Sequence, residues 1–285
     1  MSATLDNGPT GLSALDRPNS YIGRSVPRPN LARLTQGRGQ YVSDVVLPRM
    51  GHVAFVRSPH AHARIVSIDS TAAKSAPGVI AVVTGRELEA VCTPWVGVLT
   101  HLKGLKSAPQ HAIAVAKASW QGEAVAAVVA QTRAQAEDAA ELVLVEYEEL
   151  PVVADMETAL DPATPVIHPE LGDNLAWERL HVAGDPDAAF AASDHVIEAT
   201  FGFGRHTGVT LEPRAVVADY NAGEDRLTVY QATQAPHMIQ NILAKHLNLG
   251  ESQVRVLCKD VGGSFGIKVH VYADEVATAA LSKLL

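Results

Sequence analysis

The sequence predicts an α/β (α+β) fold, and three observations support that class. Short alternating or continuous apolar runs indicate strands, and alanine-rich or amphipathic stretches between them indicate helices. A strand, a helix and a strand follow one another within residues 123–150. Hydrophobic residues make up 47% of the 285 residues and charged residues 19%, which is typical of a folded chain with a sizeable core.

Residues 1–35 are predicted to form an extended or partly disordered arm, because proline, glycine, asparagine and serine occur throughout without sustained periodicity. The N-terminus has neither the basic start nor the apolar centre of a signal peptide. The longest apolar run, 124–130, is much shorter than the roughly 20 residues that a membrane helix needs. We therefore expect a soluble, cytoplasmic protein without a membrane span.

From about residue 36 the pattern changes to short ordered elements. Strands are expected at 52–58, 63–69 and 79–85. A short helix is expected at 70–78, where Ser70 suits the N-cap and Gly78 the C-terminal stop. Residues 89–118 show no clear pattern and are predicted to be rich in loops.

The clearest unit lies at 123–150. Its apolar run, 123–130, is typical of a buried strand, and the alanine-rich stretch 132–143 begins with the capping residue Thr132. Residues 144–150 return to a strand pattern. The three elements together form an α/β unit.

A domain boundary is predicted near residue 155, because prolines interrupt the acidic stretch 152–174 as in a surface linker. Beyond it, strands are expected at 194–204, 215–221, 226–233 and 253–258. A helix is expected at 236–248, with Pro236 in its first turn and an apolar face formed by Met238, Ile239, Ile242, Leu243, His246 and Leu247. The stretch 272–285 is helical in pattern and has no stop signal, so we expect truncation or continuation in another polypeptide.

Charge and cysteine content exclude several classes of protein. The formal net charge is −8 and no basic cluster is longer than a pair, which disfavours a nucleic-acid partner. The two cysteines, Cys92 and Cys258, form no CxxC pair, and an iron–sulfur cluster needs about four thiolates. The chain alone therefore carries neither such a cluster nor a cysteine-rich zinc site, and we expect both thiols to be reduced.

The glycine loop DVGGSFGIK, residues 260–268, lies between a predicted strand and a predicted helix. It is no Walker loop, because Ile267 precedes Lys268 and Val269 follows it, and its GGxxG spacing differs from GxGxxG. Glycines let backbone N–H groups converge, and a helix N-terminus adds partial positive charge. From these residues alone, an anion cradle and a packing turn stay equally open.

Several segments, taken in order, resemble the molybdenum hydroxylases of the xanthine dehydrogenase and aldehyde oxidase family. Within that family they are most similar to bacterial large subunits related to aerobic carbon monoxide dehydrogenase. These segments are residues 38–48, 54–69, 77–85, 121–151, 211–220, 233–249 and 260–268. The resemblance implies an α/β hammerhead domain at 36–154, a linker at 155–175 and the first part of a molybdopterin-binding domain at 176–285.

The resemblance also implies site residues. In the family the GGxFG loop packs its backbone against the molybdenum–pterin cofactor, a role that falls by position on Gly262, Gly263, Ser264, Phe265 and Gly266. A family glutamine that directs its side-chain amide at the metal centre corresponds to Gln234, which stands 31 residues before Phe265. The alternative is that Gln234 caps the helix that begins at Pro236.

The implied reaction is hydroxylation of an electron-poor carbon with water as the oxygen source. The cofactor would be molybdenum–molybdopterin in its cytosine dinucleotide form. The partners would be subunits that carry iron–sulfur clusters and FAD and receive the electrons, or the remaining part of the large subunit, which would complete the site. The family's glutamate base would lie beyond Leu285, so this chain alone would be inactive. Val269 replaces the glutamate of purine-oxidising members, which leaves an aldehyde or an N-heterocycle as substrate. The alternative is a non-catalytic scaffold subunit or a truncated remnant.

Other residues suggest chemistry but have simpler explanations. His60 and His62 share a strand face without a nearby acidic or thiol ligand, so no metal site is expected there. Glu212 and Arg214 are expected to pair with each other rather than to line a substrate channel. Lys268 either neutralises a cofactor phosphate or caps a neighbouring carbonyl.

Overall fold

The computed structural model describes residues 21, 26–96 and 102–285. The chain divides into two units, Met1–Gln40 and Tyr41–Leu285. Most of the predicted arm lies outside the described residues. The described part of the first unit contains a short helix, α1 (Leu31–Thr35), where the sequence predicts extended chain.

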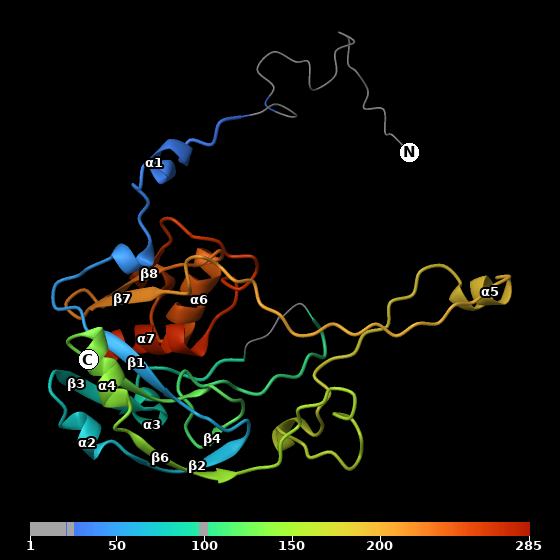
Figure 1. Cartoon of the computed structure of the whole chain (residues 1–285), viewed down its shortest axis with the longest axis horizontal. Helices are drawn as coiled ribbons and strands as arrows, with labels where there is room; N and C mark the ends of the chain where they lie inside the picture. Colours follow the sequence, from blue (N-terminus) through green and yellow to red (C-terminus); the bar gives the residue numbers. More distant parts are fainter. Residues whose placement is uncertain (1–20, 22–25, 97–101) are drawn as a thin grey trace. The chain divides into compact units, whose positions relative to one another are not determined.

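The described part of the second unit contains three sheets of three strands (Figure 1). The first has the order β1 (His52–Arg57), β5 (Ala124–Ala130), β3 (Val79–Thr84) and is antiparallel. The second has the order β4 (Lys117–Ala118), β2 (Ala63–Asp69), β6 (Leu144–Glu149) and is also antiparallel. The third has the order β7 (Val216–Asn221), β8 (Arg226–Gln231), β9 (Val254–Leu257), with β8 and β9 parallel.

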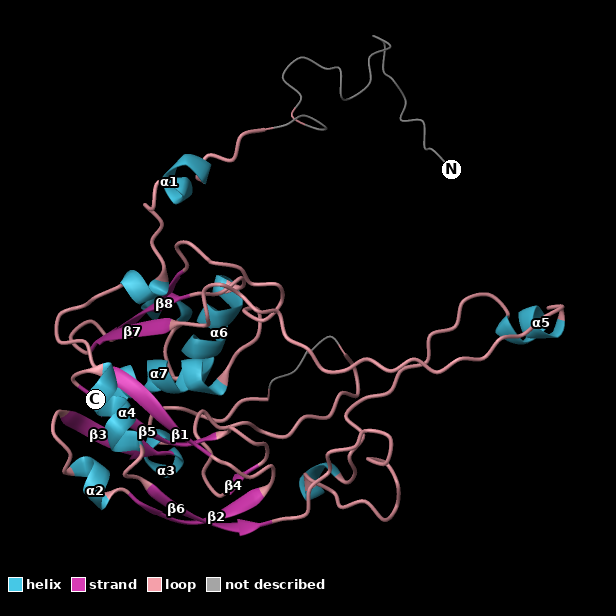
Figure 2. Ribbon diagram, in the orientation of Figure 1, coloured by secondary structure: helices cyan, strands magenta, loops and turns pink. Residues whose placement is uncertain are grey.

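Helices connect and cover these strands (Figure 2). The α-helices of this unit are α2 (Thr71–Lys74), α3 (Gly85–Leu88), α4 (Arg133–Ala140), α5 (Pro186–Ala191), α6 (Pro236–His246) and α7 (Ala273–Leu284). Single 3₁₀ turns are η1 (Val42–Asp44), η2 (Pro169–Leu171) and η3 (Glu251–Gln253). No helix of the described residues is long and apolar enough to cross a membrane.

Strand β5 is buried on both faces, which explains its continuous apolar sequence. Ala127 and Val129 belong to a core that also contains Leu227 and Val276 from the second half of the chain. The alternate residues Ala126 and Val128 pack in a second core with Ala139 of α4. Val125 belongs to a third, smaller core with Ala114 and Ala118. Because successive strand side chains point to opposite faces, one strand serves cores on both faces of its sheet.

The predicted elements of the unit at 123–150 are confirmed, and the structure adds how its strands pair. Thr132 caps α4 as predicted, because its side chain accepts a hydrogen bond from the Gln135 N–H. The two flanking strands, however, belong to different sheets: β5 pairs with β1 and β3, whereas β6 pairs with β2. Helix α4 therefore links two sheets instead of two neighbours in one sheet.

The third sheet supports the end of the chain. Helix α6 begins at Pro236 as predicted and buries Ile239, Leu243 and His246, whereas Met238 of the predicted apolar face is 38% exposed. Helix α7 packs along β7, and its Ser282 hydroxyl donates to the Ala218 carbonyl while it accepts from the Tyr220 N–H. This sheet and its two helices hold the segments on either side of the glycine loop.

One predicted strand is absent. Residues 194–204 lie in loop conformation and are exposed, although their sequence alternates as a strand does (Figure 2). A strand needs a neighbour to pair with its backbone groups, and this segment has none among the described residues. The prediction of a strand at 194–204 is therefore wrong for this chain as it folds here.

Candidate functional site

The glycine loop follows β9 and adopts unusual backbone angles. Gly263 and Gly266 have φ of +95° and +91°, in the left-handed region that glycine enters without a steric penalty. Phe265 lies in the same region with φ of +45°, although its side chain is 76% exposed. The conformation of the loop therefore depends on its glycines and not on burial of the phenylalanine.

A row of backbone donors is free in this loop. The Gly262 N–H donates to Glu212 Oε2 at 2.7 Å, and the Ile267 N–H donates to the Ser264 carbonyl at 2.9 Å. Between them, the N–H groups of residues 263–266 donate to no atom of the described residues. Successive free N–H groups in a loop with positive φ angles form a concavity suited to an anion.

Gly262 is required by a close approach of two segments. A Cβ atom at this position would lie 2.5 Å from Glu212 Cβ, a separation that side chains do not tolerate. At Gly263 the added atom would lie 3.0 Å from Phe265 Cε2 and 3.3 Å from Thr210 Cγ2. The loop therefore packs directly against residues 208–212.

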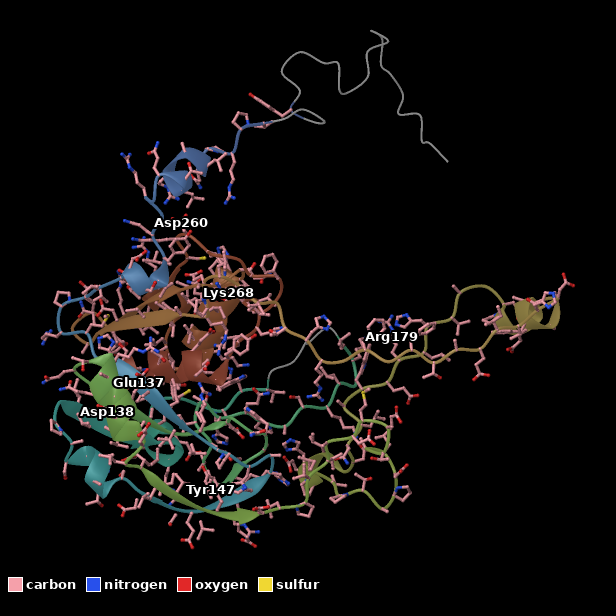
Figure 3. All side chains as sticks on the ribbon, in the orientation of Figure 1. Glu137, Asp138, Tyr147, Arg179, Asp260 and Lys268 are labelled. Carbon is pink, nitrogen blue, oxygen red and sulfur yellow. The ribbon has the colours of Figure 1, made fainter. Side chains whose placement is uncertain are left out.

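Lys268 (labelled in Figure 3) forms a buried ion pair with Glu212. Its Nζ lies 2.9 Å from Glu212 Oε2, and the two side chains are 0% and 10% exposed. The carbonyl-capping alternative for Lys268 is wrong, because its ammonium binds this carboxylate and no carbonyl of the described residues; its role toward a cofactor phosphate stays a prediction. Glu212 Oε1 is buried and has no hydrogen-bond partner among the described residues.

Arg214 does not pair with Glu212, contrary to expectation. It donates two hydrogen bonds to Asp274 and one to Glu275 in the first turn of α7, and Asp274 also pairs with Arg57 of β1. Burial opposes ionisation of Asp274, but Arg214 and Arg57 hold the pKa of that carboxyl below its usual value. Burial raises the pKa of Glu275 to about 7 against the opposing effect of Arg214.

These carboxylates change the expected role of the helix terminus. Since α7 begins at Ala273 and its first turn already holds Asp274 and Glu275, its N-terminus adds no free positive end to the glycine loop. Tyr272 connects the cluster to the loop instead. The Arg214 guanidinium lies 3.8 Å from the centre of its ring, and its hydroxyl donates to the Ile267 carbonyl at 2.5 Å.

Gln234 lies beside the end of the loop. Its N–H donates to the Lys268 carbonyl at 3.1 Å, which fixes its backbone to the glycine loop, while its side chain is exposed. The N-cap of α6 is Ala235, and no side chain caps this helix. The capping alternative for Gln234 is therefore wrong.

Two further residues near Gln234 had no role assigned from the sequence. The Thr233 hydroxyl donates to the Lys268 carbonyl at 3.0 Å and accepts from the Ala235 N–H at 3.1 Å. The Cys258 thiol donates to the Thr233 carbonyl at 2.9 Å. The position of Thr233 directly before Gln234 was the only sequence signal for this contact.

His60 and His62 lie in the loop between β1 and β2 and make separate contacts. His60 Nδ1 lies 3.6 Å from Glu149 Oε1, and its ring packs against Tyr147. His62 Nδ1 lies 2.7 Å from the Pro151 carbonyl. In the part of the chain that the structure describes, no group of three or more His, Cys, Asp or Glu side chains is arranged to hold a metal ion.

A cavity of the described residues lies elsewhere. It has a volume of about 890 Å³ and lies between residues 106–123 and 153–176, with Glu123, Lys117 and His168 in its walls. No predicted site residue lines it. Size alone does not identify a site, and the unpartnered amides of the glycine loop carry the more specific chemistry.

Comparisons with known families match both parts of the chain. Residues 36–151 match the family described as aldehyde oxidase and xanthine dehydrogenase, a/b hammerhead domain. Residues 167–285 match the family described as molybdopterin cofactor-binding domain.

Similar proteins are large subunits of greater length. The nicotine 6-hydroxylase large subunit of Paenarthrobacter nicotinovorans is 38% identical over 95% of this chain and 34% of its own length. The carbon monoxide dehydrogenase large chain of Afipia carboxidovorans is 37% identical over 89% of this chain and 32% of its own length. The crystal structure of quinoline 2-oxidoreductase from Pseudomonas putida 86 superposes with a TM-score of 0.86 at 38% identity, over 92% of this chain and 33% of that one.

The chain thus spans about a third of the length of these relatives. The two family matches, the identities and the superposition agree with the order of segments in the sequence, and they confirm both the α/β fold class and the resemblance. The chain belongs to the aldehyde oxidase and xanthine dehydrogenase family of molybdenum hydroxylases, and it corresponds to the N-terminal portion of their molybdopterin-binding large subunits.

Proposed function

We propose that this chain is the N-terminal part of a molybdenum hydroxylase large subunit and forms one wall of its cofactor site. The observation that carries the proposal is the row of free N–H groups at residues 263–266 beside the exposed side chain of Gln234. Residues 263–266 are half-exposed to exposed, so these donors are open to a group outside this chain.

The loop fits a pterin cofactor on chemical grounds. The free amides suit the phosphate and other electron-rich groups of molybdopterin, and at Gly266, where an added Cβ would meet no atom within 4 Å, the backbone is open to contact. When bound, the group supplies the redox chemistry that adds an oxygen atom from water to an electron-poor carbon. The cytosine dinucleotide form is part of the proposal.

Gln234 would orient this group through its neutral side-chain amide. An amide donates a hydrogen bond without adding charge and is a poor metal ligand, so it can position a bound group without altering its charge. The bonds from the Gln234 N–H and the Thr233 hydroxyl to the Lys268 carbonyl fix the start of α6 against the end of the loop. The backbone of Gln234 therefore stays beside the end of the loop.

The substrate class is proposed to be an N-heterocycle, with an aldehyde as the alternative. Relatives are named for nicotine, 6-hydroxypseudooxynicotine and quinoline, and two of these names denote N-heterocycles directly. Val269 stands where purine-oxidising members have a glutamate, which argues against xanthine. Electrons would pass to partner subunits that carry iron–sulfur clusters and FAD, since the two cysteines here are too few to hold a cluster.

The test compares two glycines with the same backbone strain. Gly266 and Gly122 have φ of +91° and +92°, and an added Cβ would meet no atom within 4 Å at either position. Gly266→Ala and Gly122→Ala should therefore cost similar stability. The chain is purified with the polypeptides that complete it, and molybdenum and pterin are measured per chain.

We expect Gly266→Ala to lower cofactor content at least tenfold and Gly122→Ala to leave it unchanged. Equal cofactor content in both variants would contradict a cofactor role of the loop. Absence of molybdenum and pterin from the unaltered joint preparation would contradict the whole proposal and favour the scaffold or remnant alternative.

A further inference from the structure

Residues 195–203 have a two-faced sequence that the structure leaves without a partner. The odd-numbered positions from Ile197 carry Ile197, Ala199, Phe201 and Phe203, and the even-numbered positions carry Glu198, Thr200 and Gly202. Side chains at alternate positions of a strand share one face, so this pattern gives one apolar and one polar face.

The apolar face is exposed. Ile197 is 91% exposed, Phe201 81% and Phe203 85%. Three large apolar side chains of one face in water are unfavourable, and a row of this kind marks an interaction surface. Val196, at the start of the segment, is also 61% exposed.

The backbone of the segment is equally unpaired. Among the described residues, no backbone hydrogen bond involves positions 194–203, whereas both flanks are held: the Ser193 N–H donates to the Phe190 carbonyl, and the Glu212 N–H donates to the Gly262 carbonyl. The segment runs between α5 and β7 (Figure 1). The backbone donors and acceptors of the segment are thus available for a sheet edge.

We propose that residues 195–203 form a β-strand that is added to a sheet edge in the remaining part of the large subunit. That occupant is favoured because relatives of this chain are about three times as long, and this chain covers only 34% and 33% of two of them. Strand addition satisfies the backbone through main-chain bonds and buries one side-chain face against the acceptor sheet. The inference does not depend on the cofactor.

Amide hydrogen exchange tests the pairing. The chain alone is compared with the chain joined to the polypeptide that supplies the rest of the large subunit, either as one continuous protein or as a co-purified partner. We expect amides 196–203 to exchange freely in the chain alone and at least about 100-fold more slowly in the joined form. Free exchange in both forms, or failure of the two parts to associate, would overturn the proposal.

Slow exchange of amides 196–203 in the chain alone would also overturn the proposal. The molecular mass of the chain in solution would then identify which surface pairs with the segment. A dimer would make a second copy the occupant, and a monomer would make one of the chain's own sheets the occupant.

Two adjacent substitutions test which side-chain face of the segment packs against the acceptor sheet. Phe201→Asp places a charge on the apolar face, and Thr200→Asp places the same charge one residue away on the polar face. We expect Phe201→Asp to reduce the yield of the joined form at least tenfold and Thr200→Asp to leave it within twofold, while both chains alone unfold at the same temperature. Equal effects of the two variants on the yield would contradict the assigned face.

Discussion

The buried pair of Lys268 and Glu212 makes a quantitative prediction. In Lys268→Met the side chain keeps its approximate volume but loses the charge that faces Glu212 Oε2 at 2.9 Å. The carboxylate, only 10% exposed, then retains one donor, the Gly262 N–H, and its other oxygen already lacks a partner among the described residues. Removing one partner of a buried pair costs about 3–5 kcal/mol, so we expect a loss of that size in the free energy of unfolding.

The double variant Lys268→Met/Glu212→Gln should recover most of this loss. The glutamine oxygen can still accept from the Gly262 N–H, and no uncompensated charge stays buried. Urea denaturation measures the free energy of unfolding of each variant. Non-additivity of the two changes is the expected signature of a direct interaction.

Arg64→Met is the matched control. Arg64 pairs with Glu148, but these side chains are 58% and 55% exposed, so its loss should cost no more than about 1 kcal/mol. The reasoning is refuted if Lys268→Met costs no more than Arg64→Met, or if the double variant is no more stable than the single one.

Two further predictions concern Gly262 and Glu123. Gly262→Ala should cost about 1–3 kcal/mol of unfolding free energy, because the added Cβ would lie 2.5 Å from Glu212 Cβ. Gly204→Ala is the control and should cost little, because its added Cβ would meet no atom within 4 Å. Equal shifts of the melting temperature in the two variants would contradict the packing argument. Burial raises the pKa of Glu123 from 4.5 to about 7, so the folded chain holds this proton more tightly than the unfolded chain, and its contribution to stability is lost as pH rises through 7. The melting temperature should therefore fall less between pH 5 and 8 in Glu123→Gln than in the unaltered chain, and equal slopes would refute the assignment.

Local patterns predicted the elements whose environment is local. The continuous run at 124–130 indicated a buried strand because both of its faces are covered, and Thr132 marked the start of α4 because a cap acts within one turn. The same patterns did not reveal that β5 and β6 belong to different sheets. Sheet membership depends on which distant strand pairs with each edge, and periodicity carries no information about that partner.

The ion pair wrongly predicted between Glu212 and Arg214 has the same cause, because its true partners are distant in sequence. Glu212 and Arg214 are neighbours in sequence, yet each pairs with a residue more than fifty positions away, Lys268 and Asp274 respectively. The close approach of the glycine loop to residues 208–212 selects these partners, and nothing in the local sequence encodes it. The resemblance implies that the loop and Gln234 form a site, and the structure adds which backbone groups of the loop have no partner among the described residues.

The glycines of the loop serve different purposes, and this distinction bears on function. Gly262 is needed for close packing against Glu212, whereas Gly263 and Gly266 are needed for their positive φ angles. Phe265 adopts a similar angle without being glycine, which costs about 1–2 kcal/mol, and its 76% exposure returns little of that through burial. Strain that packing does not offset recurs at binding sites, and at Phe265 it agrees with the proposal that the loop contacts a group outside this chain.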